Sequence, residues 1–205
     1  MTQSQPPITG VILSGGESRR MGQNKALMSL GASRLIDRVV DILGDVFGQL
    51  LIVTNTPDVY ADLEIPMVGD VVPNKGSLGG IYSAIYHVMT PYCFVVACDM
   101  PFLNAALMRY MMRQMTDYDV VIPDIEGQMQ PLHAIYSKAC LMPIEQRLAA
   151  DRLKIVGFLS DVRVHTVTAD EIRHVDPECL AFQNLNTPEE FQTAVERLNA
   201  LPHDR

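Results

Sequence analysis

The amino-acid sequence predicts an α/β fold, arranged as three αβα layers around a mostly parallel central sheet. Two observations support this prediction. Short apolar runs typical of buried strands alternate with helical patterns along the chain, and several of these runs end at glycine, asparagine or aspartate. Ligands bind at the carboxyl ends of strands in open α/β sheets, so these terminal residues are the first candidates for a functional site.

A chain that is 48% hydrophobic can form one substantial core, and its length suggests one domain, 1–205, or two small ones; a single domain is the prediction. The net charge of −8 argues against nucleic acid or an anionic membrane as a partner, since both attract basic surfaces. No apolar run approaches the ~20 residues of a membrane span, and the opening MTQSQPPITG lacks a secretion-signal pattern. Four cysteines without metal-type spacing fit a reducing compartment. We therefore expect a cytoplasmic protein.

The first half of the chain is expected to form four strands and two helices. The strands are 8–14, 50–55, 65–70 and 93–99. Apolar stripes at helical spacing begin at Leu35 and Ile81, and Gly48 suits the end of the first helix. Three of the strands therefore end at Asn55, Asp70 and Asp99.

The second half predicts further strands at 119–124, 131–137 and 162–167, and helices after Asn104, at about 140–149 and after Thr187. Thr187, Pro188 and Glu190 form a capping box with proline at its favoured first position. The helix after Asn104 has methionines at mostly helical spacing, which indicates core filling: Met108, Met111, Met112 and Met115. Arg152 and Lys154 either reach a substrate phosphate or form a solvated face, and the second interpretation is favoured.

The stretch 12–28 combines glycines with cations. Gly15 and Gly16 end the first strand, and Arg19, Arg20 and Lys25 follow within one short loop. Glycine permits backbone conformations that turn N–H groups inward, and the cations suit a polyphosphate. The spacing is not that of a Walker A loop, nor of G-x-G-x-x-G. A solvated basic turn is the alternative, and the coincidence of glycines and cations favours a phosphate site.

This loop resembles the nucleotide-binding signature of molybdenum cofactor guanylyltransferases, L-x-G-G-x-S-x-R-M-G-x-x-K. The matching residues are Leu13, Gly15, Gly16, Ser18, Arg20, Met21, Gly22 and Lys25. Ser14 stands where alanine is more usual, and Asn24 where many relatives have aspartate. The resemblance covers residues 8–191 and implies a Rossmann-like nucleotidyltransferase fold, with a nucleotide half at about 8–115 and an acceptor half at about 116–201.

The resemblance also implies nucleotide contacts beyond Leu13, Ser14, Gly15, Gly16 and Lys25. An asparagine at the position of Asn55 contacts the nucleotide in that family, although a turn asparagine is an equal alternative. Asp70 lies at the same predicted edge. The family's G-P-L-G/A-G element, which packs against the base, is matched by Gly76, Leu78, Gly79 and Gly80, with Ser77 in place of proline.

Asp99 is the candidate metal ligand. It ends the clearest predicted strand, and Asn104 is the better cap for the next helix, which leaves the Asp99 carboxylate available. Mg²⁺ binds through one or two carboxylates together with phosphates. The setting C-D-x-P resembles the family's magnesium aspartate, so Mg²⁺ is the expected cofactor.

Four residues are candidates for the acceptor side. Gln130 and His133 lie in a Q-P-L-H-A-x-Y stretch similar to that of relatives, although one histidine in an apolar strand is more often a structural hydrogen-bonding group. Asn184 and Asn186 match the family's N-x-N-T-P-E-E element near the metal and the second substrate. Ordinary turn asparagines are the alternative.

These residues predict nucleotidyl transfer, in which an acceptor phosphate attacks the α-phosphorus and pyrophosphate leaves. Such a phosphate is ionised near pH 7, so no catalytic base is required; positioning and charge stabilisation remain. Asp99, Lys25 and Arg20 are the predicted catalytic residues. The chain has neither a Ser-His-Asp arrangement nor the lysine–serine pair of γ-phosphate hydrolases.

The substrates follow from the resemblance alone. Guanine-using members carry L-A-G-G and cytidine-using relatives L-A-A-G, and Leu13-Ser14-Gly15-Gly16 is similar to the first. The resemblance thus implies GTP and molybdenum-molybdopterin as substrates, and molybdoenzyme apoproteins or cofactor-biosynthesis proteins as partners. The alternatives are cytidylyl transfer to the same cofactor, nucleotidyl transfer to another small phosphate, and a nucleotide-binding partner of molybdoenzymes without turnover.

Overall fold

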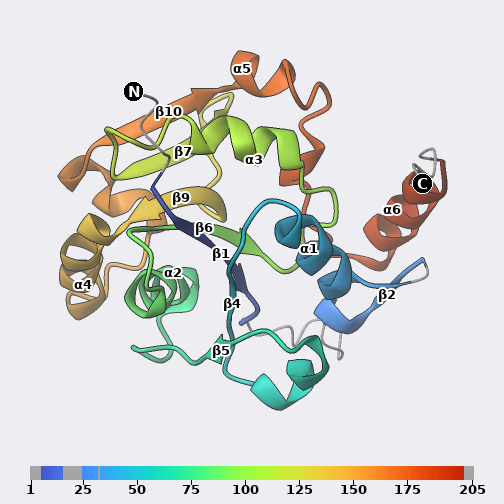
Figure 1. The fold of residues 1–205 in the computed structure, drawn as a ribbon, viewed down its shortest axis with the longest axis horizontal. Helices are drawn as coiled ribbons and strands as arrows, with labels where there is room; N and C mark the ends of the chain where they lie inside the picture. Colours follow the sequence, from blue (N-terminus) through green and yellow to red (C-terminus); the bar gives the residue numbers. More distant parts are fainter. Residues whose placement is uncertain (1–5, 16–24, 32, 201–205) are drawn as a thin grey trace.

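A computed structural model of the chain describes residues 6–15, 25–31 and 33–200. Its central sheet has the strand order β10-β7-β9-β6-β1-β4-β5, with the short β8 paired to β7 (Figure 1). The strands are β1 (Ile8–Leu13), β4 (Leu50–Val53), β5 (Met67–Val68), β6 (Tyr92–Ala97), β7 (Val120–Ile125), β8 (Gln128–Met129), β9 (His133–Ser137) and β10 (Val164–Thr168). Within this sheet β9 runs antiparallel to β6 and β7, and β8 antiparallel to β7, while the remaining neighbours pair in parallel. The prediction of a mostly parallel sheet is confirmed.

Helices cover both faces of this sheet (Figure 1). Those that pack against it are α1 (Leu35–Gly44), α2 (Gly76–His87), α3 (Ala105–Met112), α4 (Leu141–Ala149) and α5 (Ala169–Arg173), whereas α6 (Pro188–Ala200) packs in a separate cluster. Successive residues of a strand point to opposite faces: Ile12 of β1 packs with α1, α3 and α5, while Val11 packs with α2 and α4. One apolar core therefore lies on each face of the sheet, which confirms the three-layer prediction.

Several predicted elements have different bounds in the structure. The predicted strand 65–70 is reduced to β5, and the helix from Leu35 ends at Gly44 rather than Gly48. The apolar stripe of the second helix was predicted to begin at Ile81, yet α2 begins earlier, at Gly76 in the glycine-rich stretch. A Cβ added to Gly80 would lie 3.3 Å from Leu13 Cδ1. The absence of a side chain there lets the first turn of α2 pack closely against the end of β1.

Several small elements were not predicted. Strands β2 (Ser29–Leu30) and β3 (Ser33–Arg34) form an antiparallel pair just before α1, and α5 follows β10. The pair β2–β3 contributes to a third apolar cluster with the last helix, α6, which lies beside it (Figure 1). The members of this cluster are Leu30, Leu35, Phe102, Leu185, Phe191 and Ala194.

The predicted caps at the starts of α3 and α6 agree with the structure. The Asn104 side chain accepts hydrogen bonds from the backbone N–H groups of Ala106 and Leu107 at the start of α3. At α6, the Thr187 N–H donates to Glu190 Oε2 at 3.0 Å and the Glu190 N–H donates to Thr187 Oγ1 at 3.2 Å. This reciprocal pair is the capping box expected from the sequence.

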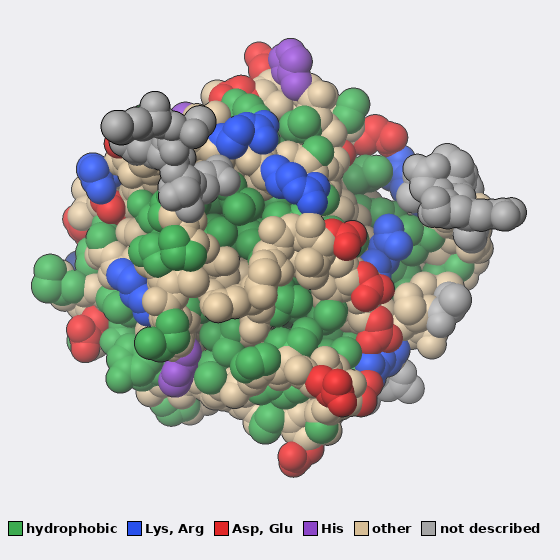
Figure 2. Space-filling view, viewed as in Figure 1, with side chains coloured by type: hydrophobic (Ala, Val, Ile, Leu, Met, Phe, Trp, Pro, Cys, Tyr) green, Lys and Arg blue, Asp and Glu red, His purple; other side chains and the backbone are tan. Residues whose placement is uncertain are grey.

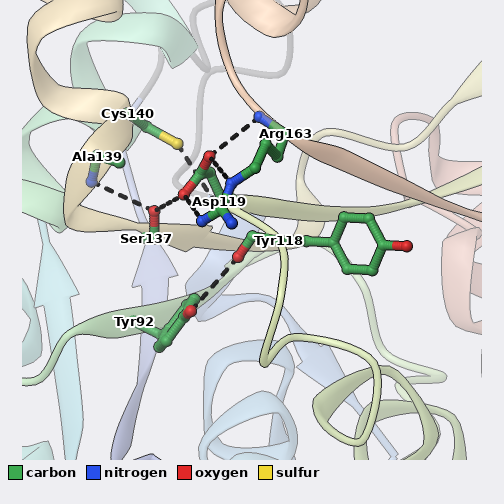
Figure 3. A network of polar contacts seen from close by, with 7 residues as sticks. All are labelled: Tyr92, Tyr118, Asp119, Ser137, Ala139, Cys140 and Arg163. Carbon is green, nitrogen blue, oxygen red and sulfur yellow. Dashed lines mark hydrogen bonds and ion pairs between the residues drawn. The ribbon is translucent and has the colours of Figure 1, made fainter.

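The amino-terminal edge of the strands has its own polar network, centred on Asp119 (Figure 3). The Arg163 guanidinium donates to both carboxylate oxygens at 3.1 and 3.0 Å, and the Arg163 backbone N–H also donates to Oδ2 at 3.0 Å. The Ser137 N–H donates to the Asp119 carbonyl at 2.8 Å. The Arg163 guanidinium holds the pKa of Asp119 below its usual value. These contacts connect the starts of β7 and β10 with the end of β9.

On the face shown in Figure 2, lysine and arginine side chains are interspersed with aspartate and glutamate. This mixture agrees with the net charge of −8. No helix within the described residues is long and apolar enough to cross a membrane.

Candidate functional site

The carboxyl ends of the parallel strands meet at one edge of the sheet. Gly15, Asn55, Asp70 and Asp99 are each the second residue beyond the end of β1, β4, β5 and β6. Because these four strands are neighbours that run in the same direction, the four residues lie along one edge. This is the edge at which open α/β sheets bind ligands.

Asn55 and Asp70 form a reciprocal pair at this edge. The Asn55 Nδ2 donates to Asp70 Oδ2 at 2.7 Å, and the Asp70 backbone N–H donates to Asn55 Oδ1 at 2.9 Å. Two hydrogen bonds in opposite directions orient both side chains. The structure therefore brings together two residues that the sequence placed at separate strand ends.

Asp99 occupies a partly buried position with unused hydrogen-bonding capacity. Its Oδ1 is buried and has no hydrogen-bond partner within the described part of the chain. Burial raises the pKa of Asp99, while a backbone hydrogen bond and the nearby Lys25 ammonium act in the opposite direction. A buried carboxylate oxygen is costly unless it is paired. The position thus suits a bound cation, which would supply the missing partner.

The single carboxylate of Asp99 is compatible with a divalent cation that also binds substrate phosphates, such as Mg²⁺. Among the described residues no group of three or more histidine, cysteine, aspartate or glutamate side chains could hold a metal ion. A closed site made of protein ligands is therefore not present in that part of the chain. Mg²⁺ is commonly held through one or two carboxylates while substrate phosphates supply further oxygens, and Asp99 with its unpaired oxygen meets that requirement.

Lys25, Asp99 and Asn186 converge from three distant parts of the sequence. Lys25 begins a 3-10 helix, Lys25–Leu27, and its Nζ donates to Asn186 Oδ1 at 3.0 Å. The Leu185 N–H donates to the Asp99 carbonyl at 3.0 Å. The segment before α6 is thus bound directly to the turn that carries Asp99.

Ser14 directs its side chain into the protein. Its hydroxyl donates to the Tyr60 hydroxyl at 2.6 Å, and its backbone N–H donates to the Val53 carbonyl at 2.9 Å. The side chain is 7% exposed. Among the described residues, no heavy atom lies within 4 Å of a Cβ placed on Gly15, the next residue. The Ser14 hydroxyl, by contrast, is already engaged within the protein.

The predicted base-packing element forms the first turn of α2. Leu78 is fully buried against the sheet and Leu13 is nearly so. Gly76 has a φ of +57°, a conformation that favours glycine. A Cβ on Gly79 would lie 2.8 Å from Lys75 Cβ. Packing within the protein therefore favours glycine at Gly79, whereas at Gly80 the near neighbour is a methyl group of Leu13.

The acceptor-side candidates lie in different environments. Asn184 and Asn186 are exposed and flank Leu185, whose N–H donates to the Asp99 carbonyl. Gln130 lies near the β7–β8 turn and donates from Nε2 to the Gln128 carbonyl at 3.1 Å. His133 is fully buried, with ring centroids 5.1 Å from Phe94 and 4.9 Å from Phe182.

His133 is a core residue in this structure. Neither ring nitrogen has a hydrogen-bond partner within the described residues, and burial lowers the pKa of His133 to about 3. The expectation that the His133 ring makes a structural hydrogen bond is therefore wrong as far as the described residues are concerned. A ring enclosed in this way also has no surface to offer a substrate, so the position does not support the acceptor-side prediction.

Two predicted site residues, Gly16 and Arg20, lie outside the described residues, as does the neighbouring Arg19.

Sequence reasoning also missed two residues that contribute to the site. Tyr60 comes from a 3-10 helix, Pro57–Leu63, between β4 and β5. Arg38 of α1 donates from Nε to the Pro101 carbonyl at 2.6 Å, close behind Asp99. Neither residue has a local sequence signal, because each role depends on contacts with distant segments.

Comparisons with known proteins agree with this geometry. The model of the family described as "MobA-like NTP transferase domain" matches residues 10–162. The chain is 41% identical over 186 residues to the "Probable molybdenum cofactor guanylyltransferase" of Pelotomaculum thermopropionicum, covering 91% of each chain. It is 38% identical over 195 residues to the "Molybdenum cofactor guanylyltransferase" of Desulfosudis oleivorans, covering 94% of this chain and 96% of that protein.

A solved structure shows the same fold. The crystal structure of "Molybdopterin-guanine dinucleotide biosynthesis protein A" from Archaeoglobus fulgidus superposes with a TM-score of 0.82 at 26% sequence identity. The similarity covers 94% of this chain and 100% of that chain. The likeness extends through the segment before α6, beyond the residues that the family model matches.

Proposed function

The chain belongs to the MobA-like NTP transferase family, and from this membership we propose that it is a molybdenum cofactor guanylyltransferase. The proposed reaction transfers GMP from GTP to the terminal phosphate of molybdenum-molybdopterin, giving the guanine dinucleotide cofactor and pyrophosphate. The names of relatives at 41% and 38% identity over most of the chain support this substrate pair.

The observation that carries the proposal is the convergence of Lys25, Asp99 and Asn186 at the ligand-binding edge of the sheet. A cation, a buried carboxylate and an amide from separate segments suit a triphosphate beside a second phosphate substrate. An oxygen of the acceptor phosphate attacks the α-phosphorus of GTP, and the bond between that phosphorus and the α–β bridging oxygen breaks. Pyrophosphate then leaves with the electron pair of that bond.

The residues of the chain contribute positioning and charge in this proposal. Lys25 binds phosphate oxygens, and its ammonium stabilises the negative charge that develops on the leaving pyrophosphate. Asp99 would hold Mg²⁺, which when bound supplies charge neutralisation at the phosphates. The acceptor phosphate is already ionised near pH 7, so the buried, neutral His133 is not required as a base.

Four free cysteines support a reducing, cytoplasmic setting for this chemistry. Burial raises the pKa of Cys98, beside Asp99, to about 11. This thiol is therefore protonated near neutral pH and is not a nucleophile in the proposed reaction.

The test measures pyrophosphate release with GTP, CTP and ATP in turn, in the presence of Mg²⁺, with and without molybdenum-loaded molybdopterin. We expect release with GTP only when the acceptor is present. A preference for CTP would assign cytidylyl transfer to the same cofactor. Tight GTP binding without any release would refute the enzymatic proposal and leave a nucleotide-binding protein.

A further inference from the structure

Asn186 contacts the predicted phosphate-binding lysine although the two residues are separated by 161 positions in sequence. The Lys25 ammonium donates to the Asn186 side-chain oxygen at 3.0 Å. Residue 186 also lies beyond residues 10–162, which the family model matches. The contact therefore adds to the nucleotide side of the site a residue that the sequence had placed on the acceptor side.

The backbone around Asn186 is fixed on two sides. On one side Leu185 is fully buried in the cluster with Leu30 and Phe191, and its N–H donates to the Asp99 carbonyl at 3.0 Å. On the other side Glu190 Oε2 accepts from the Asn186 N–H at 2.5 Å as well as from the Thr187 N–H at 3.0 Å. The Asn186 amide consequently projects from an anchored segment rather than from a loose loop.

An anchored amide oxygen is well suited to orient a lysine. The lysine side chain is long, and confining its rotamers costs free energy when a ligand binds. A neighbour that confines the side chain beforehand reduces that cost. Because the amide is neutral, it engages one of the three ammonium hydrogens without cancelling the positive charge that phosphates require.

We propose that Asn186 is a positioning residue for Lys25, holding its ammonium beside Asp99 for the phosphates of the nucleotide. This inference rests on the proposed function. It assigns the segment before α6 a part in nucleotide binding that is independent of the acceptor. If Asn186 contacted only the acceptor, substitution of Asn186 would leave the GTP affinity measured without acceptor unchanged.

The test is calorimetric titration of GTP with Mg²⁺ in the absence of acceptor, for the wild type, Asn186→Ala, Lys25→Met and the double variant. We expect Asn186→Ala to weaken GTP binding roughly three- to tenfold, the size of one ordinary intramolecular hydrogen bond, because the substitution acts on GTP only through Lys25. In the Lys25→Met background the same substitution should have no further effect, because its partner is missing. Asn186→Asp should weaken binding more than Asn186→Ala, since a carboxylate neutralises Lys25 and repels phosphate.

Gln192→Ala is the matched control. Gln192 is an exposed neutral amide on α6, and its side chain donates to Glu196 Oε1 at 2.9 Å, whereas the hydrogen bond from Lys25 goes to Asn186. We expect Gln192→Ala to retain wild-type GTP affinity. Equal loss in both alanine variants would indicate general loosening of α6 and of the segment before it, and would overturn the proposal.

Two further outcomes distinguish the positioning role of Asn186 from the proposed function. Wild-type GTP affinity in Asn186→Ala, together with a raised KM for the acceptor, would overturn the positioning role and leave the proposed function standing. A wild-type chain that bound no GTP would refute the proposed function, and with it this inference.

Discussion

At the scale of single residues, Asp99 lies in a position that disfavours its ionised form. Its Oδ1 is buried without a hydrogen-bond partner in the described residues, and burial raises its pKa. An acid whose pKa is raised on folding binds protons more tightly in the folded state, so its ionisation costs stability as the pH rises. The ligand-free protein therefore carries at neutral pH a local cost that a bound cation would remove.

Asp99→Asn is expected to separate stability from activity. The neutral amide no longer meets this desolvation cost, so thermal unfolding should occur at an equal or higher temperature. Turnover should fall by ~10²–10³, by analogy with the loss of other charge-stabilising groups. Calorimetric melting and pyrophosphate release measure the two effects. Unchanged turnover in this variant would show that Asp99 has no part in the reaction.

His133 should make the fold sensitive to acid. Its pKa is lowered by burial to about 3, against an ordinary value of 6.5. As the pH falls below 6.5 the unfolded chain binds a proton that the folded chain does not, so the free energy of unfolding decreases until the pH reaches the folded value. Between pH 7 and pH 5 this contribution is about 2 kcal/mol.

Denaturant unfolding of the wild type and of His133→Leu at pH 7 and pH 5 tests this expectation. Leucine has a similar volume and does not titrate, so the pH-dependent loss should shrink by about 2 kcal/mol in the variant. Phe94→Leu is a suitable control, because it alters the packing around the ring without removing the titrating group. An identical pH dependence in wild type and His133→Leu would contradict the assignment.

At the scale of elements, the start of α6 couples helix capping to the site. Glu190 accepts the backbone hydrogen bonds of Asn186 and Thr187, and Asn186 in turn contacts Lys25. Glu190 of the capping box therefore fixes the backbone of the segment before α6, in addition to starting the helix. A local sequence motif consequently determines the placement of a residue at the site.

Glu190→Ala should lower the free energy of unfolding by about 1 kcal/mol, since the carboxylate that accepts hydrogen bonds from the Asn186 and Thr187 N–H groups is lost. The hydrogen bond from the backbone N–H of residue 190 to Thr187 Oγ1 remains. It should also weaken GTP binding, because Asn186 loses one of its two anchors. Chemical unfolding and GTP titration measure these effects. Glu189→Ala removes a negative charge from the same helical turn but leaves the capping box intact, and it should change GTP affinity little. A Glu190→Ala variant with the wild-type GTP affinity would contradict the coupling.

At the scale of the whole molecule, the carboxyl ends of the parallel strands carry the candidate site, whereas their amino ends carry a structural polar network. The carboxyl edge carries Asn55, Asp70 and Asp99, whereas the amino edge is joined by the Asp119–Arg163 contacts (Figure 3). The side chain of Asp119 is 14% exposed, compared with 67% for Arg163. Asp119 therefore makes charged hydrogen bonds in a protected position, where they contribute more than on an open surface.

Asp119→Ala is expected to lower the free energy of unfolding by about 2 kcal/mol and to leave the KM for GTP unchanged. The reason is spatial: the substitution loosens the starts of β7 and β10 at the edge away from the site. Asp117→Ala, which removes an exposed charge from the same turn, controls for net charge. A change in KM as large as the change in stability would show that the two edges are coupled.

Much of the architecture could be predicted because its causes are local. Strands at 8–14, 50–55 and 93–99 and the helix from Leu35 were recognised from hydrophobic periodicity, which reflects which residues a neighbouring layer will bury. The caps at Asn104 and Thr187 involve residues within three positions of each other. The terminal position of Asp99 on its strand followed from the same local pattern.

The arrangement of the site required the tertiary structure. Hydrophobic periodicity does not distinguish a strand that enters a sheet antiparallel, as β9 does, or a glycine-rich stretch that becomes the first turn of α2. It also did not show that His133 would be enclosed by Phe94 and Phe182. These outcomes depend on which segments pack together, and packing is a property of the whole chain.

The sequence by itself determined the fold class, the strand ends that carry polar residues and the resemblance to a nucleotidyltransferase family, because each of these is encoded in short segments. The tertiary structure decided which of those residues meet. Lys25 and Asn186, 161 positions apart, come together because Leu185 is buried against the β2–β3 pair and hydrogen-bonded to the turn of Asp99. The free energy of such contacts comes from burial between distant segments, which no local pattern records.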